Sequence, residues 1–143
     1  MLKVEALNAG YGELLVLFDV SLQVTEHSII ALVGANAAGK TTFLNAICGI
    51  VPIVSGKIEF DGVDITQKSP YERVNAGIAH VPEGRHLFPY MTVEENLEMG
   101  AYSLKSKQEE KKNKEYVFHL FPKLLEASRT GSLLYPCFRI WGI

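Results

Sequence analysis

Apolar residues follow a strand-like pattern through the first half of the chain. Residues 2–7 and 16–24 are largely apolar and lie on either side of a glycine turn at 10–12, which predicts two strands. Residues 57–60 predict a further strand, and the Asp-Gly pair at 61–62 predicts a tight hairpin into the next one. We therefore expect an antiparallel β arm in this half.

Two continuous apolar runs differ from these segments. Residues 29–33 and 78–81 are almost entirely apolar and predict buried strands of a parallel sheet. Residues 42–48, directly after a glycine-bearing loop, predict a helix. A short helix is also expected where Ser69 provides an N-cap and Pro70 occupies the first helical position. The β arm should therefore join a strand-loop-helix unit.

The second half of the chain has a helical pattern. Thr92 and Glu95 have the spacing of a capping box, which predicts the start of a short helix. Ser106 and Glu109 repeat that spacing before a longer helix, and the mixed charges at 105–115 predict a solvated face. Apolar residues then recur at helical spacing: Tyr116, Val117, Leu120 and Phe121.

The most specific motif is Gly-Ala-Asn-Ala-Ala-Gly-Lys-Thr-Thr at residues 34–42, which matches a phosphate-binding loop at every fixed position. Backbone N–H groups of such a loop and the N-terminus of the following helix surround a triphosphate. Lys40 would contact the β- and γ-phosphates, and the Thr41 hydroxyl would ligate Mg²⁺. The alternative is a turn that ends in Lys-Thr by chance, which the flanking strand and helix argue against. The candidate nucleotide-binding residues are Gly34, Asn36, Ala37, Ala38, Gly39, Lys40, Thr41 and Thr42.

Composition, charge and cysteine content further limit the class of protein to which the sequence can belong. Of 143 residues, 48% are hydrophobic and 21% are charged, and a formal net charge of −2 gives no reason to expect a nucleic-acid partner. No apolar stretch approaches the roughly 18–20 residues that span a bilayer, so we expect a cytoplasmic protein. Cys48 and Cys137 are isolated in the sequence and predict neither a disulfide framework nor a zinc site.

Taken in order, these segments resemble the ATP-binding subunit of an ABC transporter, from residue 1 to about residue 129. Residues 77–85, Gly-Ile-Ala-His-Val-Pro-Glu-Gly-Arg, are similar to the subgroup that serves branched-chain amino acid importers. They are also similar to the ATPases of urea and short-chain amide uptake. The implied fold is α/β, a P-loop NTPase core with an antiparallel β arm and the start of a helical subdomain. The expected divisions are residues 1–83, 84–128 and an atypical tail at 129–143.

The resemblance implies roles for two residues outside the loop. Tyr11 would stack its ring on adenine, although a tyrosine packed on the sheet edge is the alternative. Glu83 stands where the family usually has a glutamine that senses the γ-phosphate and the transmembrane partner. A carboxylate there would hold Mg²⁺ through a water, which makes Glu83 the candidate catalytic and metal-binding residue. Without the resemblance, Glu83 would be interpreted as a surface loop residue.

Two departures from the family pattern matter. Ala37 stands where the family ordinarily has glycine, and a methyl group at a position of positive φ costs roughly 1–2 kcal/mol. Applied to the bound state alone, that cost would weaken nucleotide binding about 5- to 30-fold.

The signature helix, the Asp-Glu strand and the switch histidine of the family are also not found in the sequence. We therefore expect a truncation or a change of reading frame, and a chain that is inactive alone. It should also be poorly soluble, since runs 29–33 and 78–81 would lack neighbouring strands.

The resemblance implies a subunit that binds and hydrolyses ATP to energise an importer of branched-chain or related amino acids. Its partners would be transmembrane permease subunits and a second ATP-binding subunit, on the inner face of the plasma membrane. Two alternatives stay open, a catalytically dead nucleotide-binding remnant and an unrelated P-loop kinase or NTPase. The turn at Tyr11 and residues 81–85 argue against the second, because neither belongs to the generic P-loop.

Overall fold

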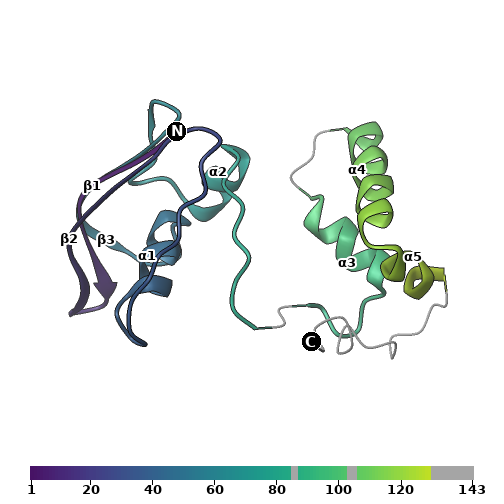
Figure 1. Ribbon diagram of the computed structural model, residues 1–143, viewed down its shortest axis with the longest axis horizontal. Helices are drawn as coiled ribbons and strands as arrows, with labels where there is room; N and C mark the ends of the chain where they lie inside the picture. Colours follow the sequence, from purple (N-terminus) through teal and green to yellow (C-terminus); the bar gives the residue numbers. More distant parts are fainter. Residues whose placement is uncertain (85–86, 103–105, 130–143) are drawn as a thin grey trace. The chain divides into compact units, whose positions relative to one another are not determined.

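The computed structural model describes residues 1–84, 87–102 and 106–129 (Figure 1). It divides the chain into two compact units, Met1–Val81 and Pro82–Ile143. The first unit contains a sheet and two helices, and the described part of the second contains three helices. Of the tail expected at 129–143, residues 130–143, with Cys137, lie outside the described residues.

A four-stranded antiparallel sheet forms the frame of the first unit, in the order β2-β1-β3-β4. Its strands are β1 (Leu2–Tyr11), β2 (Leu14–Val24), β3 (Ile53–Phe60) and β4 (Val63–Asp64). The predicted β arm is therefore confirmed, including the hairpin at Asp61 and Gly62. The turn predicted at 10–12 is wrong in position, because Gly10 and Tyr11 still pair with Leu15 and Leu14 of β2.

A shared irregularity joins the three long strands. Ala6 in β1 has a left-handed φ of 48°, and the register shifts around it against both β2 and β3. Gly56 of β3 approaches so closely that a Cβ there would lie 2.5 Å from the carbonyl oxygen of Ala6. The Asn8 side chain donates to the Ala6 carbonyl and the Ser55 hydroxyl, both at 3.0 Å, and accepts from the Asp19 N–H at 3.0 Å. One amide therefore holds β1, β2 and β3 together at the bulge.

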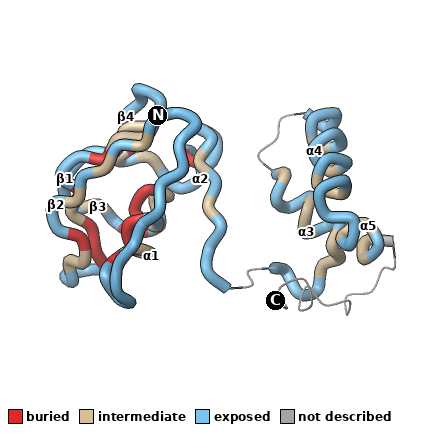
Figure 2. The backbone as a smooth tube through the Cα atoms, viewed as in Figure 1, coloured by how far each residue is buried: buried red, intermediate tan, exposed pale blue. Residues whose placement is uncertain are grey.

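Helix α1 (Lys40–Ile47) packs one face against this sheet. Thr42, Phe43, Ala46 and Ile47 are its buried residues, at the spacing of a single helix face. They meet buried residues of the strands and the following loops: Val4, Leu7, Ala9, Leu17, Val51, Ile58 and Ile65. Figure 2 shows this buried set on α1 and the neighbouring strands. The core of the first unit therefore includes the helix that follows the predicted phosphate loop.

The two apolar runs form no strand, which corrects the prediction for residues 29–33 and 78–81. Ile29 is 100% exposed, and Val33 and Val81 are each 93% exposed. The sheet in the described residues consists of β1 to β4, and neither run pairs with it. Apolar sequence therefore did not produce strands here, because a strand needs a neighbour to complete its hydrogen bonds.

The remaining helices begin much as the sequence predicts. Helix α2 (Pro70–Asn75) starts after Ser69 with a full capping box, and α3 (Val93–Gly100) starts after Thr92 with another. Helix α4 (Lys107–Leu120) follows Ser106, although the expected side-chain cap is not formed. In the second unit α5 (Pro122–Arg129) follows, and Lys114 of α4 pairs with Glu94 and Glu98 of α3. Throughout the described ranges, each helix is too short or too polar to span a membrane.

Candidate phosphate-binding site

The glycine-bearing loop leads directly into α1 through two left-handed residues. Ala37 has a φ of 64° and Gly39, the N-cap of α1, has a φ of 86°. The Ala38 N–H donates to the Ala35 carbonyl at 3.2 Å and tightens the turn between them. Gly39 is buried, and a Cβ on it would lie 2.9 Å from Leu17 Cδ2. The start of α1 is thus fixed against β2, while residues 34–38 remain exposed.

The Lys40 ammonium lies over this loop. Its Nζ donates to the carbonyl oxygens of Gly34 at 2.9 Å and Ala35 at 2.7 Å. The charge is therefore held at the loop by two weak, neutral acceptors. An anionic ligand oxygen in the same place would be a stronger partner for an ammonium than a carbonyl oxygen.

The N-terminus of α1 differs from those of α2 and α3. Ser69 with Glu72, and Thr92 with Glu95, satisfy backbone N–H groups at the other two helices. Helix α1 has no side-chain cap bond and no acidic residue in its first turn. A helix N-terminus with N–H groups and no carboxylate favours an anion. With Lys40 and the exposed loop, this donor set fits a phosphate group.

The two threonines of the motif, Thr41 and Thr42, differ in exposure. Thr41 is exposed on the first turn of α1, whereas Thr42 is buried against the core. Among the described residues, no group of three or more His, Cys, Asp and Glu side chains is arranged to hold a metal ion. A Mg²⁺ ion at this site would therefore depend on phosphate oxygens, with the Thr41 hydroxyl as a protein ligand.

Tyr11 lies at the end of β1, and its side chain is 51% exposed. The β1–β2 register places it opposite Leu14, three residues along β2 from Leu17, beside which Gly39 packs. Tyr11 and the start of α1 are therefore close to the same end of the hairpin. Tyr11 is thus half exposed at this place, and its stacking on adenine stays a prediction beside the alternative of a tyrosine packed on the sheet edge.

Glu83 is exposed and lies in the second unit, so it does not belong to the set of residues that the first unit brings together. The structure groups Tyr11 and residues 34–42 in one unit. Glu83 keeps its predicted role only as a proposal.

Sequence reasoning missed Arg73, a buried arginine of α2 whose side chain lies at the C-terminal end of α1. Its guanidinium donates to backbone carbonyl oxygens of Ala46 and Ile47, the last turn of α1. Burial lowers the pKa of Arg73, while the adjacent Cys48 raises it slightly; burial also raises the pKa of the Cys48 thiol. No local signal in the sequence identifies this arginine, because these carbonyls lie 27 and 26 residues away in the chain.

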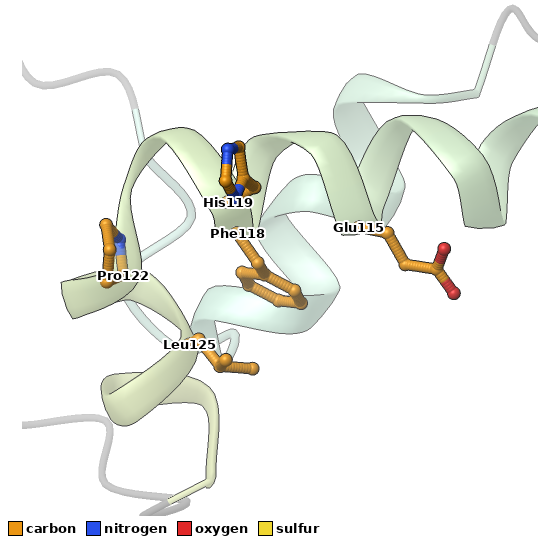
Figure 3. Close-up of a pocket in the computed structure, with 5 residues that line it drawn as sticks. All are labelled: Glu115, Phe118, His119, Pro122 and Leu125. Carbon is orange, nitrogen blue, oxygen red and sulfur yellow. The ribbon is translucent and has the colours of Figure 1, made fainter.

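An open hollow of about 450 Å³ lies on α4 and α5, lined by Glu115, Phe118, His119, Pro122 and Leu125 (Figure 3). In the figure the Phe118 ring lies beside Leu125, which makes the hollow largely apolar. None of the candidate nucleotide-binding residues lines it. It therefore takes no part in the site described above.

Residues 17–131, which include the loop, α1 and Arg73, match the ABC transporter family. The chain belongs to this family. Membership overturns the alternative of an unrelated P-loop kinase or NTPase, because the match extends over most of β2, over β3 and β4, and over the helices of the second unit as well as the loop.

Relatives within the ABC transporter family carry names for more than one transported substrate. A "probable branched-chain amino acid transport ATP-binding protein" of Archaeoglobus fulgidus is 41% identical over 87% of this chain and 52% of its own length. A "high-affinity branched-chain amino acid transport ATP-binding protein" of Pseudomonas aeruginosa is 38% identical over 93% and 58%. A Pseudomonas savastanoi protein, 35% identical over 73% and 20%, is named for ribose/galactose/methyl galactoside import. The chain thus spans about half the length of the first two relatives.

Solved ABC structures have the same fold. A structure described as the ATP-binding subunit of an ABC transporter superimposes with a TM-score of 0.66 at 32% identity. The match covers 76% of this chain and 45% of that one. The predicted fold class, a partial ABC ATPase cassette with an antiparallel sheet and helices, is therefore confirmed.

Proposed function

We propose that this chain binds ATP through residues 34–42 as part of an ABC-type ATP-binding subunit. The observation that carries the proposal is the loop itself: it delivers the Lys40 ammonium and the uncapped N-terminus of α1 to one exposed place. Both groups favour a polyphosphate. Family membership supports the same ligand class.

Each residue contributes a simple interaction in this proposal. The phosphates replace the carbonyl oxygens of Gly34 and Ala35 as acceptors for Lys40. The first-turn N–H groups of α1 donate to the same phosphates. Mg²⁺, when bound, offsets phosphate charge and is held by the Thr41 hydroxyl, with Glu83 proposed as a ligand through a water. Tyr11 stacks on the adenine ring.

At the level of the whole subunit, we infer ATP hydrolysis coupled to import of branched-chain or related amino acids. The names of the relatives from Archaeoglobus and Pseudomonas aeruginosa support this substrate class. The partners would be permease subunits and a second ATP-binding subunit, which together place the protein on the inner membrane face. Urea or amide uptake is the alternative substrate class, and nucleotide binding without turnover is the alternative for this chain.

Titration of the purified chain with a fluorescent ATP analogue and Mg²⁺ tests the proposal. We expect saturable binding that Lys40→Ala weakens about tenfold or more, because a charge-assisted contact to phosphate is lost. Lys107→Ala, which removes an exposed lysine at the start of α4, should leave the affinity unchanged. Absence of binding by the unmodified chain, or equal binding by the Lys40 variant, would contradict it. Phosphate release measured on the same samples separates turnover from binding alone.

Ala37 offers a second test of the loop. Ala37 has a φ of 64°, so its methyl group is a source of strain in the folded loop itself. We therefore expect Ala37→Gly to raise the free energy of unfolding by about 1 kcal/mol or less, since glycine also gains entropy in the unfolded chain. ATP affinity should change less than the 5- to 30-fold estimated from strain in the bound state alone. A large gain in affinity without a gain in stability would show that the loop reaches this conformation only on binding.

A further inference from the structure

Arg73 is a cation held in the interior of the first unit entirely by backbone oxygens. Only 2% of its surface is exposed. Nε donates to the Lys68 carbonyl at 2.9 Å and Nη2 to the Thr66 carbonyl at 2.9 Å. Nη1 donates to the carbonyls of Ala46 at 2.8 Å and Ile47 at 2.7 Å. Each nitrogen of the guanidinium thus has a partner.

These acceptors belong to two different parts of the fold. Ala46 and Ile47 are in the last turn of α1, and the Ala46 carbonyl also accepts from the Gly49 N–H at 3.1 Å, just beyond the helix. Thr66 and Lys68 lie in the segment between β4 and α2. A cation at a helix C-terminus also interacts favourably with the helix dipole. Arg73 therefore ties the C-terminal end of α1 to the segment that leads into α2.

The opposite end of the same helix forms the phosphate loop. Helix α1 has eight residues, so its two ends are only about 12 Å apart. A helix this short is not stable by itself and depends on packing against the rest of the fold, along its buried face and at its ends. Gly39 packing on Leu17 fixes the first end, and Arg73 fixes the second. The position of the loop N–H groups thus depends on both contacts.

We propose that Arg73 is a positioning residue for nucleotide binding: by holding the C-terminal turn of α1, it keeps the loop and Lys40 in the geometry that receives the phosphates. This inference rests on the proposed binding of ATP by the loop. It assigns Arg73 no contact with the ligand.

Gly49 provides a way to disturb Arg73 without changing it. A Cβ on Gly49 would lie 3.0 Å from Arg73 Nε and 3.3 Å from both Cδ and Cζ, so Gly49→Ala would press on the guanidinium. Gly49 has a φ of 78°, which strains any other residue. Gly62 has the same φ of 78°, but a Cβ there meets nothing within 4 Å. Gly62→Ala is therefore a matched control for backbone strain.

The experiment measures dissociation constants for ATP and AMP with the full chain and its variants. Loss of folded protein weakens the apparent binding of both ligands by the same factor. Misplacement of the loop weakens ATP more, because ATP alone brings the β- and γ-phosphates. The AMP-to-ATP ratio of dissociation constants thus isolates the effect on the loop. The variants are Arg73→Met, Arg73→Lys, Gly49→Ala, Gly62→Ala and Lys40→Ala.

We expect Arg73→Met to lower this ratio about tenfold, a change comparable to the loss of a hydrogen bond to a charged group. Arg73→Lys should lower it less, because an ammonium keeps the charge but cannot reach every carbonyl that the guanidinium fork contacts. Gly49→Ala should lower the ratio, and Gly62→Ala should leave it unchanged.

The outcomes separate the two claims. A ratio near one in the unmodified chain, or one that Lys40→Ala leaves unchanged, overturns the proposed function. A high ratio that depends on Lys40 but survives Arg73→Met and Gly49→Ala overturns the role of Arg73. If Arg73→Met does not fold, Gly49→Ala against Gly62→Ala decides the question.

Discussion

The sheet of β1 to β4 and the apolar runs at 29–33 and 78–81 consist of similar residues in different surroundings: the sheet contributes to a buried core, whereas most residues of the runs are exposed and Ile78 packs partly against that core. Leu7 and Ile58 in the sheet are fully buried, whereas Ile29 is 100% exposed and Val33 93% exposed. Each long strand of the sheet has a hydrogen-bonded neighbour, and β1 has one on either side. The two runs have none within the described sheet. Residue type therefore does not account for the difference.

The two regions differ in whether a neighbouring strand is available to complete their backbone hydrogen bonds. The β1–β2 and β3–β4 hairpins bring their own neighbouring strands from a few residues away. A parallel strand has no such local partner and depends on distant parts of a chain. The runs carry the composition of buried strands, but within the described residues they have no hydrogen-bonded neighbouring strand.

The largest expected effect comes from truncating matched side chains in the two regions. Leu7→Ala should lower the free energy of unfolding by about 2–5 kcal/mol, because it leaves a cavity among α1 and the strands. Ile29→Ala should change it by less than about 0.5 kcal/mol, since its side chain is already in solvent. Urea unfolding followed by circular dichroism measures both. Equal losses at the two positions would mean that residues 29–33 are packed in solution.

A smaller effect is expected at the polar contact that holds the sheet together. Asn8→Asp keeps the acceptor for the Asp19 N–H but replaces the donor to Ala6 with a charge facing its carbonyl. We expect a loss of about 1–3 kcal/mol in the free energy of unfolding. Asn113→Asp, an exposed position on α4, is the control and should be nearly neutral. A neutral Asn8 variant would show that backbone pairing alone sets the bulge.

The same contrast explains how far the sequence predicts the fold. Hairpins and capped helices were predicted because their signals are local: an Asp-Gly pair at 61–62, or Thr92 three residues before Glu95. The strands predicted at 29–33 and 78–81 were wrong because their formation depends on distant neighbours. Ser106 has the spacing of a cap, yet its side chain makes no cap bond, because spacing does not fix a rotamer.

The candidate site follows the same rule. The loop and Lys40 come from one continuous motif, and the sequence places them together without help from the rest of the fold. The strain estimated for Ala37 required a positive φ at this residue, and only the structure could show that φ. Arg73 was missed because its importance comes from carbonyl groups contributed by α1, and any buried or exposed arginine on a short helix has the same local sequence signal.

Making the runs polar should change solubility more than stability. The triple variant Ile29→Thr, Val33→Thr and Val81→Thr removes the most exposed apolar side chains of the runs. We expect a higher soluble fraction and weaker fluorescence of a hydrophobic dye, with little change in the unfolding midpoint. A control replaces Val54 and Val63, two isolated exposed valines of β3 and β4, with threonine. An equal gain in solubility from that control would show that the contiguous runs are not the cause.

The smallest effect concerns α2, which ends shortly before the run at 78–81 and begins with a complete capping box. Hydrogen bonds from the Ser69 hydroxyl and N–H lower the pKa of Glu72 below its ordinary value. A lowered pKa in the folded state means that this contribution is fully present above the ordinary pKa of a glutamate and is lost as the pH falls through the lowered pKa of the folded state. Glu72→Gln should therefore lower the unfolding midpoint at pH 7 and have a smaller effect at pH 3. Glu13→Gln, in the exposed β1–β2 turn, is the matched control. If the unfolding midpoints of Glu72→Gln and the unmodified chain differ by the same amount at every pH, the carboxylate charge plays no part in capping α2.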